Sequence, residues 1–154
     1  MAEKNEDVIS SLNDLIETCK DAERGFRTAA ESTRKDMNPE LRTLLNAHAQ
    51  QRARFAAELQ DEVRHRGGDP ANSGHVSAGF QRGWMNLNLA LSGNTEASIV
   101  AECETSEQSA MRNYEAALKT NLPSDLFSIV QDQYAQIKQA HARLRSLERA
   151  YKAG

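Results

Sequence analysis

Apolar residues recur every three or four positions along four stretches of this chain, which is the spacing of a buried helical face. The first stretch covers about residues 4–35 and the second about 39–66. The third covers about 95–120 and the fourth about 124–151. At ~1.5 Å per residue, each stretch predicts a helix roughly 40 Å long.

The breaks between these stretches are of two kinds. Asn38-Pro39 and the Asn121–Ser124 segment are tight turns, so we expect two antiparallel helical hairpins. Between the hairpins lies a longer connection, residues 67–94, which opens with the helix stop Gly67-Gly68. Within it, SAGFQRGWMNLNLAL predicts a short helix whose Trp84 fills part of the core.

A connection of this length can cross the bundle from one end to the other. We therefore expect an all-α fold, a ferritin-like four-helix bundle with one long crossover connection that contains a short helix. The whole chain, residues 1–154, forms a single domain on this interpretation. The alternative is that the short helix only covers an open end of the bundle.

Composition narrows the classes of function. The chain is 39% hydrophobic, 27% charged and only 5% aromatic, which favours packed helices in water. Its net charge of −3 gives no basic surface for nucleic acid or anionic membranes. The opening MAEKNEDV shows no leader pattern, and no apolar run reaches the ~20 residues of a membrane span. We expect a cytoplasmic protein of bacterial type, with Cys19 and Cys103 buried and reduced.

Six polar residues interrupt the otherwise apolar helical faces. Measured from the two turns, they fall at about the same height, so we expect them to share one polar layer in the middle of the core. These residues are Glu23, His48, Arg52, Glu107, Lys138 and His141.

Ferritin-like proteins hold two metal ions at this height, with a Glu from each of two helices and a Glu-x-x-His from each of the other two. Glu23 and Glu107 match the single glutamates, and His48 and His141 stand where the histidines belong. The glutamate three positions before each histidine is missing, because those positions hold a leucine and a lysine. Two of the six ligands are therefore absent.

Two cations stand close to the remaining carboxylates. We hypothesise that Glu23 pairs with Arg52 and Glu107 with Lys138, in internal salt bridges that replace the metal ions. Two alternatives stay open. In the first alternative, some of these side chains, above all Lys138, extend outward to solvent. In the other, one weakly held iron or manganese ion is bound by Glu23, His48, Glu107 and His141.

Four segments carry a family resemblance that spans nearly the whole chain. They are ERGFRTAAE (23–31), QQRARFAAELQ (50–60), GGDP with the following FQRGWMNL (67–87), and ECETSEQSAMRNYEAAL (102–118). With these segments the chain resembles an uncharacterised bacterial family of small ferritin-like four-helix bundles, a domain of unknown function. The resemblance implies the ferritin-like fold and no established activity.

Signatures of the common catalytic sites are missing, including a nucleotide-binding glycine loop, Gly-x-Ser-x-Gly and Cys-x-x-Cys. Our first hypothesis is a non-enzymatic helical protein, structural or stress-related. It would act as a homo-oligomer, with a dimer favoured, or by binding another protein. The second is a non-haem di-metal oxidoreductase or iron-handling protein. The third is a carrier of a small ligand in a polar pocket between the helices.

Overall fold

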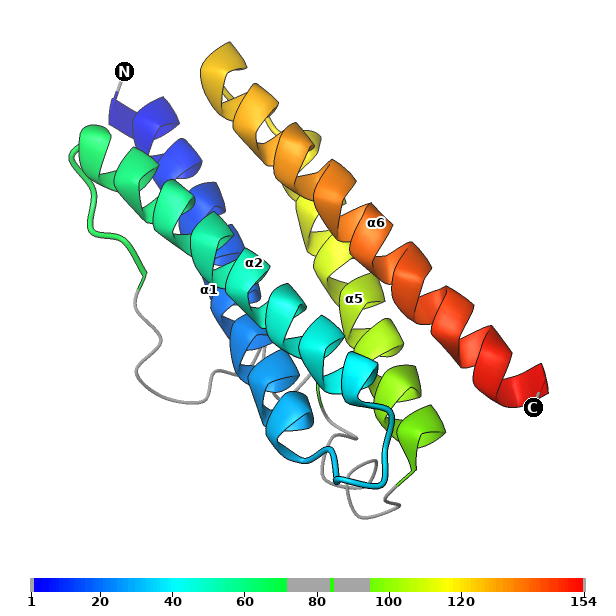
Figure 1. Cartoon of the computed structure of the whole chain (residues 1–154). Helices are drawn as coiled ribbons and strands as arrows, with labels where there is room; N and C mark the ends of the chain where they lie inside the picture. The colour runs from blue at the N-terminus through cyan, green and yellow to red at the C-terminus, as the bar shows by residue number, and fades with distance from the viewer. Residues whose placement is uncertain (1, 72–83, 85–94, 154) are drawn as a thin grey trace.

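The computed structural model describes residues 2–71, 84 and 95–153 of the chain. In these residues the protein is all-helical, with four helices and no strand. The helices are α1 (Ala2–Glu31), α2 (Pro39–His65), α5 (Glu96–Leu118) and α6 (Ser124–Ala153) (Figure 1). The four long helices predicted from the apolar spacing are therefore confirmed, with ends that differ by a few residues.

Local chemistry explains where α2 begins and ends. The side chain of Asn38 accepts a hydrogen bond from the backbone N–H of Glu40, and Pro39 occupies the first helical position. At the other end Gly67 adopts a φ of 80°, and the N–H of Gly68 donates to the carbonyl of Val63 at 3.0 Å. This pattern is a Schellman motif, in which a glycine takes the left-handed conformation that other residues avoid.

The first helix ends earlier than the sequence predicts, at Glu31 rather than Lys35. Just beyond this end, the hydroxyl of Ser32 donates to the carbonyl of Thr28 at 2.9 Å, and that of Thr33 to the carbonyl of Ala30 at 2.8 Å. Side-chain hydroxyls that bond to nearby carbonyls compete with continuation of the helix. The predicted boundary was therefore wrong by one turn.

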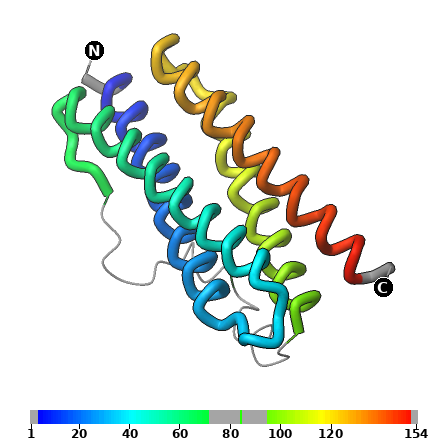
Figure 2. The backbone as a smooth tube through the Cα atoms, in the orientation of Figure 1, coloured from blue at the N-terminus to red at the C-terminus, as the bar shows by residue number. Residues whose placement is uncertain are grey.

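The helices form two antiparallel hairpins, α1 with α2 and α5 with α6 (Figure 1). The hairpins pack on each other mainly through α1 and α5, with a smaller contact between α2 and α6. α2 and α5 run in the same direction, so the end of α2 and the start of α5 lie at opposite ends of the bundle (Figure 2). None of the described helices combines the length and apolar character needed to cross a membrane.

The apolar core is divided into two clusters. One surrounds the half of the bundle that holds the α5–α6 turn, and the other the half that holds the α1–α2 turn. Leu12, Leu59 and Val130 are central to the first cluster, and Phe26 and Leu45 to the second. Between them lies a layer of buried polar side chains, which is where the candidate site is found.

Trp84, in the connection between the hairpins, is buried as predicted, with 5% of its surface exposed. Its ring lies directly on the backbone of Gly25, so that a Cβ placed there would be only 2.1 Å from Cε2 of the indole. The ring also makes an edge contact with Phe26 at 5.2 Å between centroids. The predicted short helix around Trp84 falls outside the described residues.

Candidate functional site

Arg52 and Glu107 form the centre of the polar layer. Two nitrogens of the guanidinium group donate to the two carboxylate oxygens, each at 2.5 Å, so the pair is bidentate. Both side chains are only 1% exposed. Arg52 belongs to α2 and Glu107 to α5, so the ion pair crosses the core and joins the two hairpins.

Other groups complete the surroundings of Arg52. Its Nε donates to the side chain of Gln51 at 3.1 Å, and its guanidinium carbon lies 5.5 Å from the centre of the Phe26 ring, a cation–π contact. Burial lowers the pKa of Arg52, but the charge and hydrogen bonds of Glu107 outweigh it and raise the pKa. The guanidinium group is therefore permanently charged and fully partnered in the core.

The two predicted ion pairs are wrong. Arg52 binds Glu107, whereas Glu23 binds Arg27 one turn along α1 at 2.9 Å and is partly exposed. Lys138 lies on the exposed side of α6, with its ammonium group 4.8 Å from the centre of the Tyr134 ring. The two cations differ in their position on the helix. Arg52 is buried, so its long side chain spans the core to Glu107, whereas Lys138 is at an exposed position and reaches solvent.

His48 is buried beside this pair, with 5% of its surface exposed. Its Nδ1 is buried with no hydrogen-bond partner, and its ring meets Phe26 edge to face at 5.2 Å. Burial, followed by the positive charges of Arg52 and Arg143, lowers the pKa of His48 to about 4. The imidazole is thus held neutral in the core.

His141 is not part of the central pair. Its Nε2 lies 2.7 Å from Oε1 of Glu104 on α5, and both side chains are 12% exposed. The same Glu104 oxygen accepts a hydrogen bond from Gln108 at 2.8 Å. This second pair ties α5 to α6 and leaves His141 with a carboxylate other than Glu107.

A second polar feature of the layer is a chain of hydrogen bonds that passes through all four helices. The thiol of Cys19 on α1 lies 3.0 Å from the phenol oxygen of Tyr114 on α5, and that phenol donates to the amide oxygen of Gln133 on α6 at 2.7 Å. The amide nitrogen of Gln133 donates to the carbonyl of Phe55 and, at 2.7 Å, to Glu58 on α2. This chain and the central ion pair both connect the two hairpins.

The thiols of Cys19 and Cys103 are buried and unpaired by disulfides, as predicted. Burial raises the pKa of Cys19 to about 11, and it raises the pKa of Cys103 as well. Burial and the neighbouring Cys19 also raise the pKa of Tyr114. At neutral pH these groups are uncharged, so the layer contains no activated nucleophile among them.

The four candidate metal ligands do not converge. Glu23 is held by Arg27, Glu107 by Arg52 and His141 by Glu104, while His48 faces the Phe26 ring. Among the residues that the structure describes, no three His, Cys, Asp or Glu side chains are grouped as they would be around a metal ion. The arrangement of these side chains does not fit the metal site that the sequence offered as an alternative, because a guanidinium group occupies the carboxylate that would bind an ion.

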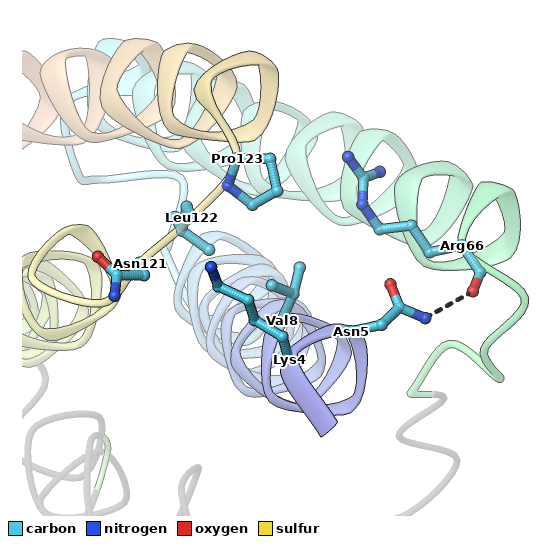
Figure 3. Close-up of a pocket in the computed structure, with 7 residues that line it drawn as sticks. All are labelled: Lys4, Asn5, Val8, Arg66, Asn121, Leu122 and Pro123. Atoms are coloured by element: carbon cyan, nitrogen blue, oxygen red, sulfur yellow. Dashed lines mark hydrogen bonds between the residues drawn. The ribbon is translucent and has the colours of Figure 1, made fainter. Parts of the chain in front are cut away.

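Away from the layer, a surface hollow of about 520 Å³ lies at the end of the bundle that holds the α5–α6 turn. Figure 3 shows Lys4, Asn5 and Val8 of α1 on one side of it and Asn121, Leu122 and Pro123 of the turn on another. Arg66 also lines it, but its guanidinium group is bound by Glu62 at 2.8 Å and Asp125 at 3.1 Å. None of the described residues that line this hollow supplies an acid, thiol or imidazole for catalysis.

Sequence reasoning missed Gln133 and Glu104. The buried positions of α6 step through Val130, Gln133, Ile137 and Ala140, whereas His141, expected in the layer, lies one position beyond the buried Ala140. The spacing alone contained this signal, because Gln133 continues the rhythm of three and four as well as Tyr134 does. Glu104 gave no such signal, since it directly follows Cys103 and lies off the apolar spacing of three and four.

A family model described as a domain of unknown function, DUF2383, matches residues 7–120. The match covers most of α1 together with α2 and α5, and it ends before α6. No curated protein matches the sequence. The resemblance to a family of unknown function is therefore confirmed, whereas its bacterial origin and ferritin-like character stay predictions.

Proposed function

This chain belongs to the DUF2383 family, and from its geometry we propose a non-enzymatic helical bundle with a structural or stress-related role. It acts by self-association, as a dimer, or by binding another protein. The bundle is ferritin-like, and its polar layer is a degenerate metal site that has become structural. The observation that carries this proposal is the buried, bidentate pair of Arg52 and Glu107.

Charge balance supports the structural role of the layer. A di-metal centre concentrates about four positive charges and uses several carboxylates to offset them. Here the fully buried carboxylate, that of Glu107, is already neutralised by Arg52. A bound cation would have to displace a guanidinium group that has no path to solvent without rearrangement of the core.

Metal content tests this part of the proposal. Protein purified from cells grown with added iron and manganese is expected to carry far less than one ion per chain. Asp61→Ala serves as a control, because Asp61 is an exposed carboxylate of α2 outside the polar layer. Iron or manganese close to one ion per chain, lost in Glu107→Ala but kept in Asp61→Ala, would overturn the proposal.

Sedimentation velocity over a wide range of protein concentration tests self-association. We expect a dimer whose population rises with concentration, and crosslinking followed by mass spectrometry would identify the surface. A species that stays monomeric at every concentration, and that captures no partner protein, would contradict both forms of the interaction role.

A second candidate function is a non-haem di-metal oxidoreductase or iron-handling protein. One observation favours it: Nδ1 of His48 is buried without a partner in the same layer as Glu107. An unpaired imidazole nitrogen is what a metal ligand presents before the metal binds. The metal analysis above distinguishes this function from the structural one.

A further inference from the structure

The buried positions of the two hairpins repeat with a period of seven residues. On α2, the positions one heptad before and after Arg52 are Leu45 and Leu59, and both are fully buried. On α5, the positions one heptad before and after Glu107 are Val100 and Tyr114, and both are fully buried as well. On each of these two helices the ion pair therefore takes one step of a seven-residue repeat whose neighbouring steps are buried and uncharged.

A repetitive interface allows more than one alignment. Because α2 and α5 run in the same direction, a shift of one hairpin by seven residues would again bring large buried side chains face to face (Figure 1). In one direction of shift Arg52 would face Val100, and in the other it would face Tyr114. Glu107 would then face Leu59 or Leu45. Either shift leaves two buried charges without partners.

We propose that the pair of Arg52 and Glu107 fixes the register between the two hairpins, so that only one of the alignments compatible with the apolar pattern is populated. A single buried polar position plays this part in coiled coils, where it selects register at a cost in stability. The proposal rests on the layer being structural, as inferred above. The ion pair selects the alignment of the two hairpins, while the apolar clusters hold the hairpins together.

Disulfide trapping between α1 and α5 reads the register directly. The side chain of Asn113 donates to the hydroxyl of Thr18 at 3.1 Å, so Thr18→Cys with Asn113→Cys reports the native alignment. Ser11→Cys with Asn113→Cys reports a shift of one heptad in one direction. Thr18→Cys with Thr120→Cys reports the opposite shift. The native Cys19 and Cys103 are buried, and the protein without added cysteines is the blank.

Each pair is oxidised with diamide, with and without EDTA, in three backgrounds. With Arg52 and Glu107 intact, only the native pair is expected to crosslink. In Arg52→Met with Glu107→Leu, the helical circular dichroism signal is retained, and the two shifted pairs crosslink at yields comparable with the native pair. Arg52→Glu with Glu107→Arg keeps an ion pair in the layer and is expected to restore crosslinking of the native pair alone.

Matched substitutions of an exposed ion pair provide the control. Arg64 and Asp61 lie 3.0 Å apart on the surface of α2, so Arg64→Met with Asp61→Leu is expected to leave the register unchanged. The proposal is overturned if the apolar core variant crosslinks only in the native pair, or if it loses its helical signal. If EDTA alone permits shifted crosslinks in the parent, a metal ion sets the register and the proposed function fails instead.

Discussion

Arg52 shows how one long side chain changes the character of a core. Its guanidinium group satisfies both oxygens of Glu107, donates to Gln51 and lies over the Phe26 ring, so that each of its three nitrogens has a partner. Buried ion pairs of this kind add little net stability, but removal of one partner leaves an uncompensated charge in the core. The contribution of the pair to the free energy of unfolding therefore depends on both residues being present.

Substitution of Glu107 by Leu alone is expected to lower the free energy of unfolding by about 3–5 kcal/mol, because Arg52 remains buried without its partner. Adding Arg52→Met is expected to recover most of this loss. Urea denaturation of the parent, both single variants and the double variant measures the coupling. Additive losses in the double variant would show that the two charges do not act as a pair.

His48 makes stability depend on pH. Its pKa is about 4 in the folded protein against an ordinary value of 6.5, a difference worth about 3 kcal/mol at 1.36 kcal/mol per unit. Because the folded-state pKa is depressed, this stability is fully present above pH 6.5 and is lost as the pH falls from 6.5 to 4, where the unfolded chain binds a proton and the folded chain does not.

His48→Leu is therefore expected to flatten the decline in unfolding free energy between pH 6.5 and 4. His65→Gln, a substitution at an exposed histidine at the end of α2, is the control and should follow the parent. Chemical denaturation at half-unit intervals of pH measures both curves. Equal slopes in the parent and in His48→Leu would contradict the assignment of this loss to His48.

At the scale of elements, apolar spacing predicted all four helices, because each buries a stripe and each turn carries Asn, Gly or Pro. It also placed Arg52 and Glu107 in the core. It failed on which partner each charge chooses, since pairing depends on the lengths of side chains and on which helices face each other. On α6 it placed Lys138 and His141 in the layer, whereas Lys138 is exposed, His141 is partly buried, and the buried Gln133 was missed.

Gly25 of α1 leaves room for the indole ring of Trp84 to pack on the helix backbone. Gly25→Ala is expected to cost about 1–3 kcal/mol, because the added Cβ overlaps the indole of Trp84 and the ring must move. Trp84 is the only tryptophan in the chain, so its fluorescence reports that movement. Gly67→Ala is the comparison: it has open space but a positive φ, so it should cost about 1 kcal/mol without a change in the emission maximum.

At the scale of the whole molecule, the two apolar clusters raise the question of whether they unfold together. Cys19 lies in one cluster and Cys103 in the other, and both thiols are completely buried. If the chain is one cooperative unit, iodoacetamide should label both at the same rate in native buffer, after global opening. Peptide mass spectrometry resolves the two sites. Labelling of one thiol well before the other would show that the clusters open separately.

The central ion pair also makes the two halves of the chain unlike. The hairpin of α1 and α2 supplies the cation, and the hairpin of α5 and α6 supplies the anion. A hairpin that packed against a copy of itself would bury a charge with no mate of opposite sign. Residues 1–71 and 95–154, made as separate peptides and mixed, should therefore associate with each other more strongly than either peptide associates with itself.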